Sequence, residues 1–360
     1  MASLRLQGLT KRFGDVVAVH ELTLEVPSGE LVALLGPSGC GKTTTLRMVA
    51  GFDVPTRGRI VLGDRDITAD PPERRDCGMV FQHYALFPHL TVEQNVAFGL
   101  EMRGLRRPDV ERRVGEILER VGLGGLGRRY PRQLSGGQQQ RTALARALVI
   151  SPRVLLLDEP LANLDAKLRE EMRFYIRSLQ REFHITTLYV THDQAEALVL
   201  ADRVAVLMNG RLQQVGAPEE IYHRPRTPAV AAFIGLTNLL PGRVTGRSGE
   251  RLVLETPAGT VRAAGAPDLR EGMEAMLSVR PEHIELDRPG EPASRDGVNR
   301  LRGVVQERTF LGSLIDFRVD VGGGVLLRVQ GRGGAPQRVG EQVSVSFDTT
   351  AAWALPRREG

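Results

Sequence analysis

The sequence predicts an α/β domain built around a largely parallel sheet, followed by a smaller all-β domain. Short apolar runs alternate with helical patterns over residues 4–216, whereas alternating strand patterns with Gly-rich turns begin near residue 235. A chain of 360 residues is long enough for two hydrophobic cores, and its 41% hydrophobic and 25% charged residues argue against wholesale disorder. We therefore expect one domain over residues 1–234 and a second over residues 235–360.

Composition and charge exclude several classes of protein. No run approaches the roughly 20 apolar residues that a transmembrane helix needs. Any N-terminal signal core is interrupted by four charged residues, Arg5, Lys11, Arg12 and Asp15. The 48 basic residues barely exceed the 43 acidic ones, so the net charge of +5 is not evidence for a nucleic-acid partner. Two cysteines give no disulfide framework, which suits a reducing cytoplasm.

Apolar runs and helical periodicity define the elements of the first domain. The predicted buried strands cover residues 31–35, 154–157, 187–191 and 204–208. Between residues 84 and 150 apolar residues repeat at helical spacing, which predicts a helical subdomain. Residues 166–183 carry apolar side chains on one face and predict an amphipathic helix that packs on the core.

The second domain contains a short internal repeat. Residues 240–244 and 301–305 are similar, and each precedes a predicted hairpin. Such a repeat fits a duplicated small β-barrel and fits a plain antiparallel domain equally well.

A phosphate-binding loop follows the first predicted strand. Two glycines five residues apart precede Lys42 and Thr43, and a helix pattern follows. Glycines let backbone amides surround a polyphosphate, Lys42 supplies charge to the β and γ phosphates, and the Thr43 hydroxyl can hold Mg²⁺. An ordinary Gly-rich turn would leave Lys42, one of only three lysines, unexplained. The residues expected to bind nucleotide here are Gly36, Pro37, Ser38, Gly39, Cys40, Gly41, Lys42, Thr43 and Thr44.

Two carboxylates end the predicted strand at 154–157. In a parallel sheet this end lies beside the phosphate loop, so Asp158 is expected to reach Mg²⁺ directly or through water. Glu159 is the candidate general base for the water that attacks the γ-phosphate. An acidic turn after a strand is common, and the phosphate loop is what favours the catalytic interpretation.

A second anion-binding helix end is predicted at residues 135–138. Ser135, Gly136, Gly137 and Gln138 open a helix with exposed amides. One nucleotide rarely needs two such ends from one chain, whereas a twofold dimer would offer each end to the nucleotide on the other copy. The alternative is an ordinary Ser N-cap followed by a flexible Gly pair.

Together these motifs resemble the nucleotide-binding subunit of an ATP-binding cassette (ABC) transporter, in particular the importer ATPases for sugars, polyamines, sulfate and iron. The resemblance covers essentially the whole chain. It implies a P-loop NTPase cassette with a helical subdomain, and a C-terminal OB-like regulatory β-barrel of the TOBE type, visible at residues 277–282 and 310–313. In the family such a barrel can bind a regulator, the transported solute or the same barrel of a second copy of the chain.

The resemblance also implies site residues outside the main motifs. Phe13 would stack on adenine, Gln82 would sense the metal and the lytic water, Asp165 would face the partner copy, and His192 would touch the γ-phosphate. Taken singly, Phe13 could be a core residue, Gln82 a surface amide and His192 part of a capped turn. Ala162 stands where the family commonly has serine, which predicts a modest slowing of turnover.

Two further expectations concern segments beside the nucleotide. Residues 84–88 would line the groove that receives a helix of the membrane subunit, with core packing as the alternative, and Tyr84→Asp or Phe87→Asp should uncouple ATPase from transport without unfolding the chain. The helix N-terminus should lower the pKa of Cys40, so that thiol reagents would block ATP binding, although Cys40 could equally be a tolerant loop position.

The predicted function is an ATPase that binds ATP and Mg²⁺ and drives solute uptake as a homodimer on membrane permease subunits. It would lie at the cytoplasmic side of the membrane, would work indirectly with an extracytoplasmic solute-binding protein and would bind no nucleic acid. The alternatives are a cytosolic ABC ATPase acting on ribosomes or nucleic acid, and a non-hydrolysing nucleotide sensor, which Glu159 and His192 disfavour. The sequence does not name the solute.

Overall fold

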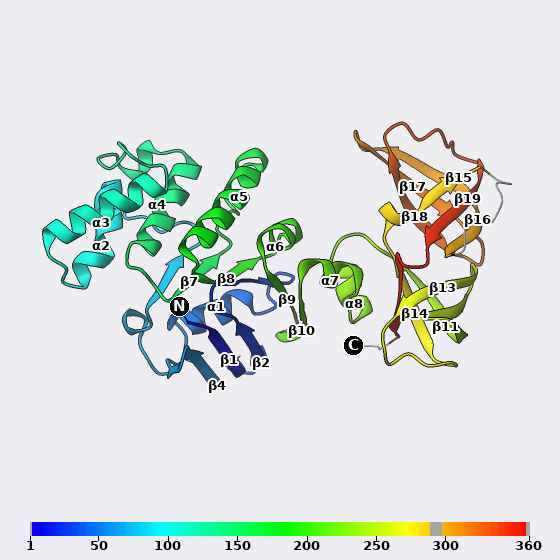
Figure 1. Ribbon diagram of the computed structural model, residues 1–360, viewed down its shortest axis with the longest axis horizontal. Coiled ribbons are helices and arrows are strands. Elements are labelled where there is room, and N and C mark those ends of the chain that lie inside the picture. Colours follow the sequence, from blue (N-terminus) through cyan, green and yellow to red (C-terminus); the bar gives the residue numbers. More distant parts are fainter. Residues whose placement is uncertain (1, 289–296, 358–360) are drawn as a thin grey trace. The chain divides into compact units, whose positions relative to one another are not determined.

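A computed structural model describes residues 2–288 and 297–357 and divides into two compact units, Met1–Pro218 and Glu219–Gly360 (Figure 1). The predicted domains also include residues 1, 289–296 and 358–360, which lie outside the described residues.

The central sheet of the first unit has six strands in the order β10-β9-β3-β8-β7-β6. Its strands are β3 (Leu31–Leu35), β6 (Cys77–Val80), β7 (Val154–Asp158), β8 (Thr186–Thr191), β9 (Arg203–Met208) and β10 (Arg211–Gly216). All neighbours are parallel except β9 and β10. Every residue of β3 and β8 is buried, because helices and the second sheet cover both faces, and this explains the continuous apolar run of β3 and the apolar centre of β8. The predicted α/β fold is confirmed.

A smaller antiparallel sheet, which the sequence analysis did not predict, packs on the same core. Its order is β2-β1-β4-β5, and its strands are β1 (Leu4–Phe13), β2 (Val16–Val26), β4 (Arg57–Leu62) and β5 (Arg65–Asp66). One hydrophobic cluster contains side chains of this sheet, of the central sheet and of helix α1 (Lys42–Ala50). The phosphate-loop helix is therefore held between the two sheets.

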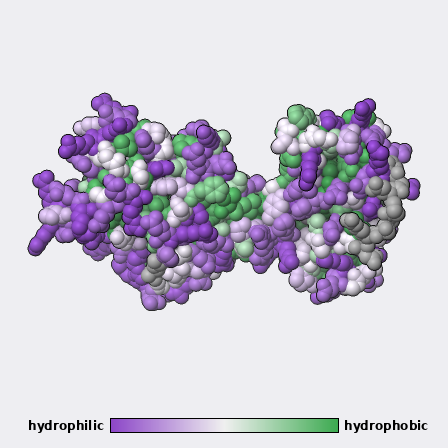
Figure 2. Space-filling model, turned by 45° about the horizontal axis from the view of Figure 1, so that its top comes forward, coloured by the Kyte–Doolittle hydropathy of each residue, from purple (hydrophilic) through white to green (hydrophobic). Residues whose placement is uncertain are grey.

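Three helices form the group predicted between residues 84 and 150, and Figure 1 shows them together beside the sheets. They are α2 (Val92–Met102), α3 (Arg107–Arg120) and α4 (Gly136–Leu148). Helix α5 (Ala166–Phe183) has the predicted bounds and buries the predicted face, and α6 (Gln194–Leu200) follows β8. The outer surface over α2 and α3 is mainly hydrophilic (Figure 2). Within residues 2–288 and 297–357, no helix is both long enough and apolar enough to span a bilayer.

The second unit contains a closed barrel and a five-stranded sheet that share one hydrophobic core. The barrel order is β11-β12-β13-β20-β14, with strands Asn238–Ser248, Arg251–Thr256, Gly259–Gly265, Ala352–Pro356 and Glu274–Val279 in that order. The sheet order is β15-β19-β16-β17-β18, with strands Glu285–Asp287, Gln342–Asp348, Val298–Phe310, Leu314–Asp320 and Leu326–Arg332. The two repeated segments lie in β11 and β16 and lead into hairpins as predicted, but only the first belongs to a closed barrel.

Two short helices, α7 (Pro218–His223) and α8 (Pro228–Phe233), precede the barrel. The sequence predicts a boundary between residues 234 and 235, whereas contacts group residues 219–234 with the second unit. The reason is Arg280, which is 3% exposed and donates hydrogen bonds to the carbonyls of Tyr222, Ala231, Ile234 and Leu236.

Candidate nucleotide-binding and hydrolysis site

The phosphate loop joins β3 to α1 and is shaped by its glycines. Gly41 has φ +101°, and a Cβ there would lie 2.5 Å from the carbonyl oxygen of Ala18. A Cβ on Gly36 would lie 2.1 Å from the carbonyl oxygen of Leu207. Only glycine fits at these two positions, so the loop packs tightly against β2 and β9.

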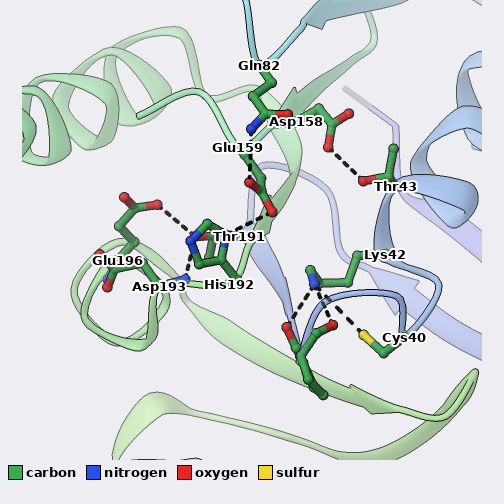
Figure 3. A network of polar contacts seen from close by, with 12 residues as sticks. Cys40, Lys42, Thr43, Gln82, Asp158, Glu159, Thr191, His192, Asp193 and Glu196 are labelled. Carbon is green, nitrogen blue, oxygen red and sulfur yellow. Dashed lines mark hydrogen bonds and ion pairs between the residues drawn. The ribbon is translucent and has the colours of Figure 1, made fainter. Parts of the chain in front are cut away.

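Lys42 folds back over this loop (Figure 3). Its side chain is buried, and Nζ donates to the carbonyls of Gly36 at 2.7 Å and Pro37 at 3.0 Å. Both partners are neutral dipoles, so the ammonium charge is solvated by the loop itself and is available to an anion placed there. Thr44, in the first turn of α1, is half-buried.

Cys40 differs from its predicted chemistry. The thiol is 3% exposed, and burial raises its pKa although the nearby Lys42 ammonium acts to lower it. The predicted lowering by the helix N-terminus is therefore wrong, because desolvation of the thiolate outweighs the favourable charge. Cys40 is a small loop residue whose side chain points into the core.

Thr43 and Asp158 come together across the site. The Thr43 hydroxyl donates to Oδ1 of Asp158 at 3.2 Å, which joins the start of α1 to the end of β7 (Figure 3). Burial raises the pKa of Asp158, the Thr43 hydrogen bond opposes this rise, and the neighbouring Glu159 charge adds to it. Two oxygen ligands of the type that Mg²⁺ prefers therefore face each other beside the phosphate loop.

Glu159 projects from a strained backbone between two polar side chains. Its φ is +44°, and its amide donates to the carbonyl of Val190 at 2.9 Å. Oε2 accepts from Gln82 Nε2 at 3.4 Å, and Oε1 lies 3.0 Å from His192 Nδ1 (Figure 3). A carboxylate held in this way can accept a proton from a nearby water.

His192 lies in the turn between β8 and α6, and buried hydrogen bonds fix both sides of this turn. Asp193 caps α6 by accepting from the amide of Glu196 at 3.1 Å. Glu196 is 3% exposed and accepts from the hydroxyls of Tyr189 and Thr191, each at 2.8 Å. His192 is thus part of a capped turn and also contacts Glu159.

Asn163 is a site residue that sequence reasoning missed. Its amide Nδ2 donates to the carbonyl of Gln82 at 2.6 Å and lies 3.2 Å from His83 Nδ1. It therefore holds the backbone of Gln82 from a segment 81 residues further along the chain. No local pattern in the sequence signals this contact.

The segment after Gln82 departs from the predicted groove lining. Tyr84 is 6% exposed, and Arg146 donates to its carbonyl at 2.8 Å, so Tyr84 is a core residue. We therefore expect Tyr84→Asp to destabilise the fold, contrary to the expectation from the sequence, because the substitution would bury a carboxylate. Phe87 is half-buried, and its ring centroid lies 4.7 Å from that of Phe98, which is 37% exposed.

The helix end at Ser135 is formed but does not meet the phosphate loop of its own chain. Ser135 and Gln138 form a reciprocal capping box, in which the Gln138 amide donates to Ser135 Oγ at 3.3 Å and the Ser135 amide to Gln138 Oε1 at 3.0 Å. Gly136 and Gly137 back onto Leu164 and Leu168. Over the part of the chain that the structure describes, no hydrogen bond joins residues 135–138 to Lys42, Thr43, Asp158 or Glu159.

Asp165 and Phe13 belong to elements next to the phosphate loop and the helix end at Ser135, namely the start of α5 and the β1–β2 hairpin. Asp165 caps α5 through the Leu168 amide at 3.0 Å. Phe13 is 51% exposed, which rules out the core alternative, and the Lys11 ammonium lies 4.9 Å from its ring centroid. Phe13 pairs with Val16 at the turn of the β1–β2 hairpin. Ala18, in the same strand as Val16, packs against Gly41 of the phosphate loop. The exposed ring of Phe13 is therefore carried by the hairpin that contacts the loop.

Comparisons with known proteins agree with this geometry. The ABC transporter family matches residues 19–162, and the TOBE domain family matches residues 277–355. The chain belongs to the ABC transporter ATP-binding proteins and is an ATPase with a C-terminal TOBE domain.

Its relatives share nearly the whole chain. The spermidine/putrescine import ATP-binding protein PotA of Rubrobacter xylanophilus is 48% identical over 366 residues, covering 99% of this chain and 95% of that protein. The protein of the same name from Acidothermus cellulolyticus is 53% identical over 311 residues, with 86% and 80% covered. That of Nitrosospira multiformis is 42% identical over 354 residues, with 98% and 97% covered.

Proposed function

We propose that the chain is the ATP-hydrolysing subunit of a polyamine importer and works as a homodimer on membrane permease subunits. The observation that carries the catalytic part is the placement of Glu159 between Gln82 and His192, beside the Thr43–Asp158 pair. The part that concerns polyamines rests on the names of the relatives.

ATP binds with its phosphates on the backbone amides of residues 38–44 and its adenine on Phe13. The ammonium of Lys42 exchanges its carbonyl partners for β and γ phosphate oxygens, which become more negative as the terminal bond breaks. The aromatic face of Phe13 is already exposed for stacking.

The Thr43 hydroxyl and the Asp158 carboxylate fit Mg²⁺, because both are hard oxygen ligands and lie 3.2 Å apart. Among residues 2–288 and 297–357 no group of three His, Cys, Asp or Glu side chains is placed to hold a metal, so phosphate oxygens and water would complete the coordination. When bound, Mg²⁺ neutralises charge on the phosphates. Gln82, also expected at the metal, donates to Glu159 in this structure.

Hydrolysis uses Glu159 as general base. Glu159 accepts a proton from water as the water oxygen forms a bond to the γ-phosphorus, and the bond from that phosphorus to the β–γ bridging oxygen breaks to release ADP and phosphate. Gln82 orients the carboxylate and the water, and His192 donates to a γ-phosphate oxygen from the opposite side of Glu159.

Each site is completed by the partner copy. Ser135, Gly136, Gly137 and Gln138 offer a capped helix end that, among the described residues, makes no hydrogen bond to Lys42 or Thr43. Asp165 lies on the segment that packs against this helix end. ATP closes the two copies on each other, and hydrolysis lets them part. The closing and opening of the dimer change the conformation of the permease subunits. The chain binds these subunits at the cytoplasmic side of the membrane as a peripheral subunit.

Uptake measurements test this function. Cells that lack the chromosomal gene and express the wild-type chain should accumulate labelled spermidine or putrescine, whereas cells that express Glu159→Gln at the same level should not. Uptake of a labelled sugar or of sulfate serves as the control. Loss of sugar or sulfate uptake with normal polyamine uptake would contradict the proposed solute, and co-sedimentation with ribosomes instead of membranes would contradict the importer.

A further inference from the structure

A buried arginine lies beside the C-terminal end of the phosphate-loop helix. Arg75 is 1% exposed and heads the largest fully buried side chains of the described residues. Its guanidinium donates to the carbonyls of Met48 at 2.6 Å, Val49 at 3.0 Å, Thr68 at 2.8 Å and Asp70 at 2.7 Å.

Among the described residues, backbone carbonyls accept the hydrogen bonds of this cation, and the Asp70 carboxylate acts on it only through space. Asp70 offers Arg75 its carbonyl, while the Asp70 carboxylate pairs with Arg65 at 2.7 Å. Burial acts to lower the pKa of Arg75, but an arginine stays charged at neutral pH. Burying a cation that has no carboxylate in direct contact costs free energy, and here carbonyls that include two at the negative end of the α1 dipole stabilise it.

The end of α1 is built around the guanidinium. Gly51 caps α1 with φ +88°, and a Cβ at Gly51 would lie 2.7 Å from Nε of Arg75. Met48 and Val49 are in the last turn, where carbonyls lose their partners within the helix. Arg75 donates hydrogen bonds to both carbonyls. The contact therefore depends on the geometry of the guanidinium as well as on its positive charge.

Arg75 connects two elements that both lead to the site. Helix α1 carries Lys42 and Thr43 at its first turn, and Arg75 holds its last turn. Arg75 itself lies two residues before β6, and β6 ends two residues before Gln82. The guanidinium therefore joins the distal ends of two elements whose other ends carry phosphate-binding and catalytic residues.

We propose that Arg75 is a positioning residue for ATP binding and hydrolysis, which fixes α1 relative to β6 and so sets the placement of Lys42 and Thr43 against Gln82. The proposal rests on the proposed ATP binding and hydrolysis, and its Kd readout requires neither dimerisation nor the solute. A purely structural arginine would stabilise the fold without affecting the affinity of the folded protein for ATP.

The test compares Arg75→Met and Arg75→Lys with two controls in the full-length chain. Arg280→Met removes another buried arginine with four carbonyl partners, but from the second unit. Met172→Ala removes buried volume from α5 in the first unit and is expected to lower the thermal midpoint. For each variant, the thermal midpoint, the Kd for MgATP by calorimetry at low temperature, and the kcat and KM of hydrolysis are measured.

We expect Arg75→Met to raise the Kd and KM for MgATP by about tenfold or more and to lower kcat, because a small displacement of Lys42 and Thr43 misplaces the phosphates. Arg75→Lys keeps the charge and the stem but lacks the planar fork, so its Kd should lie between wild type and Arg75→Met. Both controls should retain wild-type Kd and KM.

A folded Arg75→Met or Arg75→Lys protein with wild-type Kd, KM and kcat would overturn the proposal, whatever its thermal midpoint. An equal rise of Kd in Met172→Ala would also overturn it, because the effect would then follow from stability alone. If Arg75→Met does not fold, Arg75→Lys decides by the same criteria.

Discussion

The imidazole Nδ1 of His192 lies 3.0 Å from Oε1 of Glu159, while Gln82 donates to the other oxygen of the same carboxylate. The side chain of Glu159 is only 18% exposed, whereas that of His192 is 57% exposed. The carboxylate is therefore oriented by groups from two separate loops before any substrate arrives, and the more exposed imidazole is the group that can turn towards a phosphate.

Glu159→Gln should abolish hydrolysis without abolishing ATP binding. An amide keeps the shape of the side chain but cannot accept a proton from water, so kcat should fall by roughly 10²- to 10⁴-fold. Steady-state phosphate release and calorimetric ATP binding check the two parts. Glu250→Gln, at an exposed turn of the second unit, is the matched control and should behave as wild type. Full turnover in Glu159→Gln would remove the general-base assignment.

Asp158→Asn should raise the stability of the ATP-free protein and should abolish ATP hydrolysis. Burial raises the pKa of Asp158, so the native state disfavours the carboxylate at neutral pH. A raised carboxyl pKa means that the folded state binds the proton more tightly than the unfolded state, and this group's contribution to stability decreases as pH rises from the unfolded pKa through the folded pKa.

The gain in thermal midpoint from Asp158→Asn should therefore be present at pH 7 and should vanish below about pH 4, where the carboxyl is neutral in both states. Thermal unfolding across this pH range is the measurement. A variant less stable than wild type at pH 7 would contradict the prediction.

Neither native thiol should react quickly in the folded protein. Burial raises the pKa of Cys40, and burial raises that of Cys77 to about 12. Because the thiolate is the reactive form, both should be modified slowly at pH 7 and rapidly after unfolding in denaturant. Ser38→Cys places a thiol at an exposed position of the same loop and should react at once. Labelling of Cys40 as fast as Ser38→Cys would contradict the burial argument.

Tyr84→Asp and Phe87→Asp should differ in stability. Tyr84 is 6% exposed, so Tyr84→Asp buries a carboxylate and should lower the free energy of unfolding by about 3 kcal/mol or more. Phe87 is half-buried, and Phe87→Asp should cost distinctly less while it removes the ring contact with Phe98. Denaturant unfolding of both variants measures the difference, and equal losses would show that Tyr84 is not a core residue.

Sequence patterns predicted the strands that are buried on both faces and the helix that is buried on one face. Strands β3 and β7 are buried and contain continuous apolar runs, β8 is buried around an apolar centre, and α5 begins directly after its Asp165 cap. Strands β1 and β2 were not predicted, because only alternate residues are buried and charged residues interrupt the pattern.

Contacts between distant segments were beyond sequence reasoning. Arg75 reaches Met48 across 27 residues and Asn163 reaches Gln82 across 81, and no local sequence pattern predicts either contact. The phosphate loop predicted Cys40 near a helix N-terminus but not its burial, so the direction of its pKa shift was wrong. The spacing of residues in a motif identifies candidate site residues, whereas the burial that sets their pKa values depends on tertiary packing.

Cross-linking between two protomers, each carrying one added cysteine, tests the shared site most directly. Protomers carrying Ser38→Cys are mixed with protomers carrying Ser135→Cys, both in the Glu159→Gln background, and treated with a short bismaleimide with and without MgATP. The slow native thiols stay in place, and protein without the added cysteines is the control. A linked heterodimer that forms only with MgATP is the predicted result. The variants must bind MgATP, and the same variants with Glu159 restored must hydrolyse it. If no linked heterodimer forms under these conditions, the proposal that the partner copy completes each site is contradicted.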